Sequence, residues 1–119
     1  MQIRLEHANL CVRDIEVMIR FFKTAFPEFR ARGEGKSRDG TRWVHVGTND
    51  TYIALGQAKA DSERHWMPYS GEPGVNHLAY EVDDRKRVYF YDPEGNDWEF
   101  VQYFSQDPAE RNDYELPDS

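Results

Sequence analysis

The 119-residue sequence predicts a single α+β domain assembled from two related modules of short strands. Three observations lead to this fold class. A strand pattern that begins with a histidine occurs twice, an amphipathic helix follows its first copy, and a proline–glycine turn separates two aromatic strands near the end of the chain. An internal repeat of this kind is decisive for the fold, because it indicates one structural unit used twice.

The repeat relates segment 5–14 to segment 75–84. In each copy a valine follows the histidine by five residues, and an acidic residue follows the valine by two. The residues concerned are His7, Val12 and Asp14 in the first copy and His77, Val82 and Asp84 in the second. Both segments are therefore predicted to be equivalent strands.

A helix is predicted over residues 15–26, directly after the first strand. Asp14 suits the N-cap because its side chain can accept hydrogen bonds from the free N–H groups of the first turn, and Pro27 ends the helix. Apolar residues at three- and four-residue spacing form one stripe that should cover the outer face of a sheet. They are Ile15, Val17, Met18, Phe21, Phe22, Ala25 and Phe26.

Three further strands complete the first module. A weak strand is predicted around 29–32, and the Asp39-Gly40 turn leads into a strong strand over 41–47. A turn over 48–51 then returns the chain through a strand at 52–56. The first half thus has the order β, α, β, β, β.

The second module contains a hairpin around the Asp-Pro-Glu-Gly turn at 92–95, where proline and glycine supply the backbone angles that a turn needs. In the strand after this turn, Asp97, Glu99, Val101 and Tyr103 share one face. Glu99 lies mid-strand among residues suited to burial, so its carboxylate needs a partner.

These segments divide the chain into module one (about 3–57), a linker that is also a candidate lid (58–73), module two (about 74–104) and a polar tail (105–119). The second module lacks a helix and a strand after Asp84. Two or three residues cannot join strands that are not neighbours in a sheet. We therefore favour a missing segment over a truly reduced module, and a native mass matching 14.1 kDa would exclude that interpretation.

Composition restricts the possible functions. A net charge of −7 favours a soluble protein and opposes nucleic-acid binding, because little positive charge is available for phosphates. No apolar run approaches the ~18 residues of a membrane span, and the N-terminus has no signal-peptide core. The lone Cys11 is interpreted as a small core residue, and a chain without an internal disulfide fits the cytoplasm.

Together, the histidine strands, the Asp-Pro-Glu-Gly-Asn turn and the Trp-Glu-Phe-Val strand resemble the vicinal oxygen chelate superfamily. Its members include glyoxalase I, extradiol dioxygenases, fosfomycin resistance transferases and bleomycin resistance proteins. The resemblance covers nearly the whole chain. It implies paired βαβββ modules forming a cup-shaped mixed sheet around a divalent metal ion, here with an apparently shortened second module.

The resemblance also implies a metal site. His7, His77 and Glu99 match metal ligands of the superfamily, and such a set suits Fe, Mn, Ni, Zn or Co. The fourth ligand position falls on Ala54, which argues against ordinary four-ligand glyoxalase chemistry. If Gly47 pairs with Tyr52, His45 lies opposite Ala54, where it is a candidate substitute ligand or catalytic acid or base. An ordinary strand histidine, or a glutamate in a plain salt bridge, is the alternative for each residue alone.

Aromatic and arginine side chains are candidates for binding substrate, with core packing or plain surface location as the alternative. They are Trp43, Tyr52, Arg87, Tyr89 and Tyr103, with Arg42 as a second arginine. The resemblance implies a lyase, isomerase or dioxygenase acting on a small oxygenated molecule. A sequestering protein of the bleomycin resistance type is the competing class. It also implies a homodimer, in which His7 comes either from the same chain as the other two ligands or from the partner.

Overall fold

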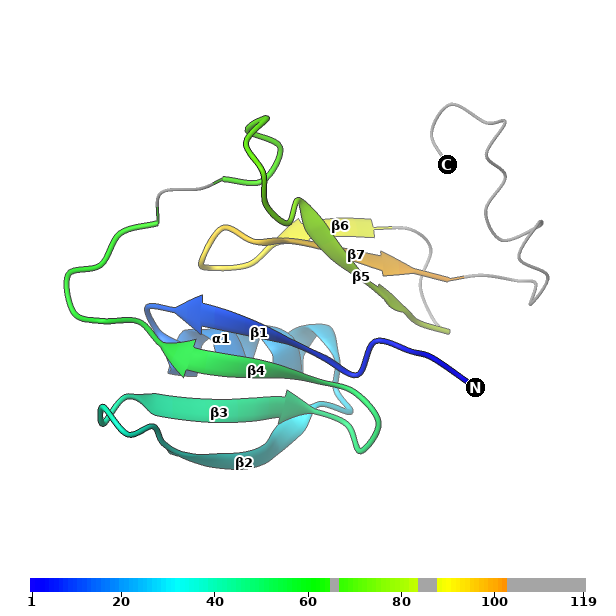
Figure 1. The fold of residues 1–119 in the computed structure, drawn as a ribbon. Coiled ribbons are helices and arrows are strands. Elements are labelled where there is room, and N and C mark those ends of the chain that lie inside the picture. The colour runs from blue at the N-terminus through cyan, green and yellow to red at the C-terminus, as the bar shows by residue number, and fades with distance from the viewer. Residues whose placement is uncertain (65–66, 84–87, 103–119) are drawn as a thin grey trace. The chain divides into compact units, whose positions relative to one another are not determined.

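The computed structural model describes residues 1–64, 67–83 and 88–102, and it gives backbone positions alone for Val88 and Tyr89. The described residues form two compact units (Figure 1). The first contains residues 1–64 together with Asp92–Glu94, and the second contains the remaining described residues. No helix in these ranges is long and apolar enough to cross a membrane.

The first unit has the predicted βαβββ order. Its elements are β1 (His7–Val12), α1 (Ile15–Ala25), β2 (Arg30–Lys36), β3 (Arg42–Gly47) and β4 (Tyr52–Gln57). They form a four-stranded sheet of order β1-β4-β3-β2, in which β1 runs parallel to β4 and the other pairs are antiparallel. Strand β2 is longer than predicted because its backbone pairs with β3 even where its sequence is glycine-rich and polar.

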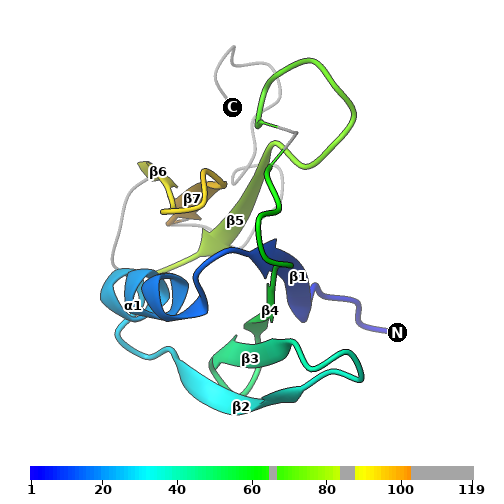
Figure 2. The same cartoon turned by 90° about the vertical axis from the view of Figure 1, so that its left-hand side faces the viewer.

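Helix α1 covers one face of this sheet (Figure 2). Asp14 is its N-cap as predicted: the backbone is extended there, and its Oδ1 accepts a hydrogen bond from the Val17 N–H at 3.1 Å. The core contains the α1 stripe and the helix-facing residues of β3 and β4. Its fully buried members include Ile15, Met18, Phe22, Val44, Val46, Ile53 and Leu55.

The other face of the sheet leaves Cys11 exposed, so its assignment to the core was wrong. Neighbouring strand residues point to opposite faces. Val12 takes the buried position in β1 with only 1% of its surface exposed, and Cys11 is therefore turned away from α1.

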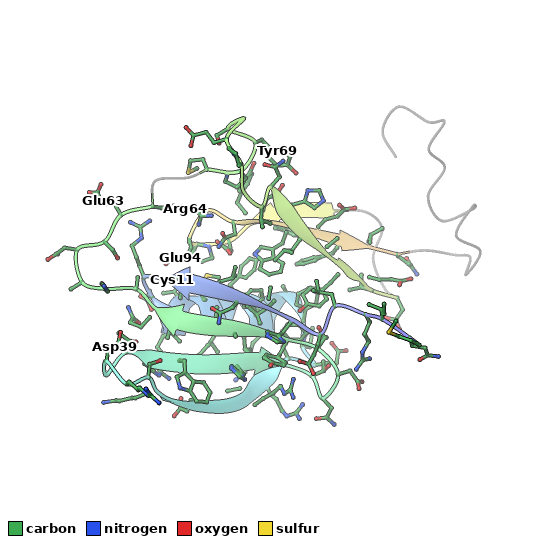
Figure 3. The ribbon with its side chains drawn as sticks, viewed as in Figure 1. Cys11, Asp39, Glu63, Arg64, Tyr69 and Glu94 are labelled. Atoms are coloured by element: carbon green, nitrogen blue, oxygen red, sulfur yellow. The ribbon has the colours of Figure 1, made fainter. Side chains whose placement is uncertain are left out.

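The Asp-Pro-Glu-Gly turn contributes a carboxylate to the first unit (Figure 3). Glu94 accepts hydrogen bonds from the backbone N–H groups of Arg13 at 2.9 Å and Asp14 at 3.3 Å, where β1 passes into α1. Arg64 donates to the Glu94 carbonyl at 2.9 Å. Gly95 has φ of +89°, the left-handed conformation for which glycine was predicted there.

The second unit is a three-stranded sheet made of β5 (His77–Glu81), β6 (Val88–Tyr91) and β7 (Asp97–Val101). Its order is β5-β7-β6, with β5 parallel and β6 antiparallel to β7. These strands repeat β1, β4 and β3 in order and direction. Among the described residues, nothing corresponds to α1 or β2.

The connection between β5 and β6 is longer than the sequence prediction assumed. Strand β5 ends at Glu81 and β6 begins at Val88, which leaves residues 82–87 to pass β7. Six residues reach about 20 Å when extended, whereas passing one strand requires about 10 Å. The argument that the connection is too short was therefore wrong, and a reduced module is sterically possible.

The turn between β3 and β4 supplies a stability test. A Cβ atom at Gly47 would lie 2.2 Å from the Thr51 carbonyl oxygen, whereas one at Gly33 would meet nothing within 4 Å. We expect Gly47→Ala to lower the free energy of unfolding by about 1–3 kcal/mol through overpacking. Gly33→Ala should stay within about 0.5 kcal/mol. Urea denaturation measures both, and equal stability of the two variants would contradict the proposed steric cause.

Candidate active site

The two sheets place their histidines at equivalent positions. His7 is the first residue of β1 and pairs with Tyr52, the first residue of β4. His77 is likewise the first residue of β5 and pairs with Asp97, the first residue of β7. Two residues further on, Ala54 in β4 occupies the position that Glu99 has in β7. The first sheet therefore has a methyl group where the second has a carboxylate.

Glu99 has the partner that its burial requires. Its side chain is 9% exposed, and its Oε2 lies 3.2 Å from Nε2 of His77, whose side chain is 35% exposed. The two residues meet diagonally across β5 and β7, because Glu99 pairs with Ala79 and His77 pairs with Asp97. On the opposite face of β7, Trp98 and Phe100 are each 1% exposed. The carboxylate is thus held on a strand that is buried on both faces, whereas the imidazole comes from the more exposed β5.

This pair fits two adjacent ligands of one metal ion. Two ligand atoms at about 2.1 Å from an octahedral ion and at right angles to each other are about 3 Å apart. Asp97 supplies a further oxygen on the same face of β7, and its buried Oδ1 has no hydrogen-bond partner among the described residues. No three His, Cys, Asp or Glu side chains in the described ranges are close enough to hold a metal ion. Within the described ranges His77 and Glu99 are therefore a pair and not a group of three potential ligands.

Tyr69 is a neighbour of the His77–Glu99 pair that the sequence prediction missed. Its hydroxyl lies 2.7 Å from Nδ1 of His77, so the imidazole has a polar neighbour at each ring nitrogen. Tyr69 precedes β5 in the segment interpreted as a linker (Figure 3). Tyr69 lies in a turn and shares no strand or helix with His77, so no periodicity in the sequence relates the two residues.

The first sheet carries a row of four rings on the face away from α1. The ring of His7 stacks on Tyr52 at a centroid distance of 4.7 Å and an interplanar angle of 8°. The ring centroid of His45 lies 4.6 Å from that of Tyr52 and 4.9 Å from that of Trp43. The predicted register holds, with Gly47 opposite Tyr52 and His45 opposite Ala54. The structure thus groups four of the predicted site residues in one unit.

Arg32 adds a positive charge to this aromatic row. It occupies an irregularity in β2 between Ala31 and Gly33, and its guanidinium carbon lies 4.3 Å from the centroid of the Tyr52 ring. The indole of Trp43 covers Gly35 so closely that a Cβ there would lie 2.7 Å from it. The sequence prediction missed Arg32, because the weak strand predicted over 29–32 gave no register for it.

His45 has a lowered pKa in this setting. Burial, the positive charge of Arg32 and the nearby His7 each hold the pKa of His45 below its usual 6.5. The imidazole therefore stays neutral at a pH where an exposed histidine would begin to take up a proton. A neutral imidazole can accept a proton from a bound molecule.

The remaining candidates lie elsewhere or outside the described residues. Arg42 is on the α1 side of the sheet, where it bonds Glu16 at 2.5 Å and Glu34 at 3.0 Å, so it does not reach the aromatic row. Tyr89 pairs with Glu99 in the register of β6 and β7, but the side chain of Tyr89 is not described. Arg87 and Tyr103 lie outside the described residues.

Comparison with known proteins supports the fold. No family model and no curated protein matches the chain. The FosX fosfomycin resistance protein of Mesorhizobium loti is 22% identical over 85% of this chain and 92% of that one, with a TM-score of 0.60. A glyoxylase/bleomycin resistance protein/dioxygenase domain from Frankia sp. EAN1pec is 14% identical over 92% and 98% of the two chains, with a TM-score of 0.67.

A FosX variant from Listeria monocytogenes is 14% identical over 87% and 96% of the two chains, with a TM-score of 0.61. That protein was crystallised with Mn(II) and 1S,2S-dihydroxypropylphosphonic acid. At these identities the likeness establishes the fold. The chain has the fold of the vicinal oxygen chelate proteins, as its motifs predicted.

The pKa of His45 supplies a test of the aromatic row. We expect NMR titration of its C2 proton to give a pKa below 6.5, and Arg32→Gln to raise that pKa because one positive neighbour is removed. The His45 imidazole stays partly buried in the Arg32→Gln variant, so part of the lowering of its pKa should persist. Arg20→Gln, on exposed helix surface, should leave the titration unchanged. A wild-type pKa above 6.5, or no response to loss of Arg32, would contradict this account.

Proposed function

We propose that this protein is a metal-dependent enzyme acting on a small oxygenated organic molecule. The observation that carries the proposal is the 3.2 Å contact between the His77 imidazole and the buried Glu99 carboxylate. A buried carboxylate is costly unless it is paired or binds a metal. The nearby Asp97, whose buried oxygen lacks a described partner, adds to the negative potential on that face.

The proposed metal ligands are His7, His77 and Glu99. The repeat supports His7, because it begins β1 in the register in which His77 begins β5. In this proposal His7 comes either from the same chain or from a second copy in a homodimer. Nitrogen and carboxylate ligands suit Fe, Mn, Ni, Zn or Co, and three protein ligands leave positions open for substrate or water.

A divalent ion in such a site supplies Lewis acidity, which stabilises negative charge that develops on substrate oxygens. The side chains of this protein would perform the other tasks. His45 is the proposed acid or base, because its lowered pKa keeps the imidazole neutral and ready to accept a proton. Tyr52 and Trp43, which flank His45, would bind the apolar part of the substrate.

Arg32 favours a substrate that carries a negative charge. Arg32 is an exposed residue and its guanidinium lies over the Tyr52 ring, so it can make charge-assisted hydrogen bonds to a carboxylate or phosphonate. The FosX variant from Listeria monocytogenes was crystallised with a phosphonic acid, and this supports an oxygen-rich, anionic substrate here.

The reaction type stays open among lyase, isomerase, dioxygenase and epoxide-opening chemistry. Ala54 opposes a four-ligand site of the ordinary glyoxalase type, because its methyl group cannot bind a metal. Iron would direct attention to oxygenase assays, and manganese, nickel, zinc or cobalt to the other reactions.

The alternative is a protein that sequesters a small molecule without reaction, as bleomycin resistance proteins do. The row formed by His7, Tyr52, His45 and Trp43 favours this reading, since stacked rings can hold a planar ligand without a metal. The buried His77–Glu99 pair opposes it, because simple sequestration gives no reason for that pair.

Elemental mass spectrometry of the untagged protein tests the metal proposal. We expect near-stoichiometric divalent metal in the wild type and at least a tenfold loss in His77→Ala and Glu99→Gln, each of which removes one proposed ligand. Glu63→Ala, which alters an exposed carboxylate, should retain the metal. Absence of metal from the wild type after reconstitution would move the conclusion to ligand sequestration.

A further inference from the structure

The segment between the two modules holds Tyr69 in an unusual backbone conformation. Its φ is +62°, a left-handed value that is uncommon for a residue with a large side chain. The side chain of Asn76 compensates, because its Oδ1 accepts a hydrogen bond from the Tyr69 N–H at 2.8 Å. Asn76 directly precedes His77, the first residue of β5. Its side chain therefore ties the turn at Tyr69 to the start of that strand.

This conformation directs the Tyr69 hydroxyl to His77. The hydroxyl oxygen lies 2.7 Å from Nδ1, and the two rings stack with a centroid distance of 6.3 Å. Nε2, on the other side of the imidazole, lies 3.2 Å from Oε2 of Glu99. We propose that Tyr69 is a positioning residue that fixes the orientation of the His77 ring, so that Nε2 points to Glu99.

The hydrogen-bond chemistry explains why a tyrosine suits this role. An ionised carboxylate only accepts, so neutral His77 must carry its proton on Nε2 to bond Glu99, and Nδ1 then accepts from the hydroxyl. When Nε2 serves as an electron-pair donor, the proton lies on Nδ1, and the hydroxyl oxygen accepts from it instead. A tyrosine hydroxyl can do both. It therefore supports the same ring orientation in either tautomer.

The affinity part of this inference rests on the proposed metal function, whereas the orientation of the His77 ring does not. Partners of the second ring nitrogen typically change metal affinity by about 10- to 100-fold when they are removed. The proposal thus predicts two separable effects of Tyr69→Phe, one on the His77 tautomer without metal and one on metal affinity.

The first measurement is a long-range ¹H–¹⁵N spectrum of the metal-free protein. We expect wild-type His77 to carry its proton on Nε2, and Tyr69→Phe to shift the ¹⁵N signals towards a mixture of tautomers. The second is the Mn(II) dissociation constant from EPR, which should rise about 10- to 100-fold in Tyr69→Phe. Tyr80→Phe, which alters the opposite face of β5, should change neither quantity.

Asn76 supplies a second pair of variants should Tyr69→Phe fail to fold. Asn76→Ala removes the acceptor for the Tyr69 N–H and should shift His77 in the same direction by a smaller amount. Asn76→Asp keeps an acceptor oxygen and should restore the wild-type spectrum.

The outcomes separate the two proposals. An unchanged His77 spectrum in a folded Tyr69→Phe protein overturns the positioning role, whether or not Mn(II) binding weakens. If the wild type does not bind Mn(II) but the spectrum responds to Tyr69→Phe, the positioning role stands and the metal proposal fails. A changed spectrum together with weaker Mn(II) binding supports both.

Discussion

The burial of Glu99 in the middle of β7 is the constraint on which the second unit depends. A strand that is buried on both faces has no water for a carboxylate, so that group must find a partner within the protein. His77 is this partner, and the parallel register of β5 and β7 brings the two side chains together. Trp98 and Phe100 hold the other face of the same strand in the core. Packing and candidate chemistry therefore share one five-residue element.

The sequence was sufficient for features that follow from periodicity and local chemistry. The N-cap Asp14, the amphipathic stripe of α1 and the left-handed Gly95 all have local causes, and each lies where it was predicted. The pairing of His45 with Ala54 followed from the turn that Gly47 begins. Because a strand alternates its faces, one correct turn fixed the neighbours of every residue on two strands.

Features that depend on long-range geometry were beyond the sequence. Arg32 reaches Tyr52 through an irregularity in β2, and no spacing in that glycine-rich segment indicates it. Tyr69 reaches His77 through a left-handed residue that sequence rules assign to glycine or asparagine. Cys11 was assigned to the core from its residue type, although its alternation with Val12 already indicated the opposite face.

Ala54 and Glu99 occupy equivalent positions in the two sheets, so the modules differ there in charge as well as in size. Each position of the strand pattern occurs twice, and at this position only the second copy has a carboxylate. In the first copy, the rings of His45 and Tyr52 and the guanidinium of Arg32 lie close to the equivalent position, Ala54. The first sheet thus presents rings and a positive charge near the position where the second sheet buries a negative one, so the two halves differ in chemical character although they share one strand register.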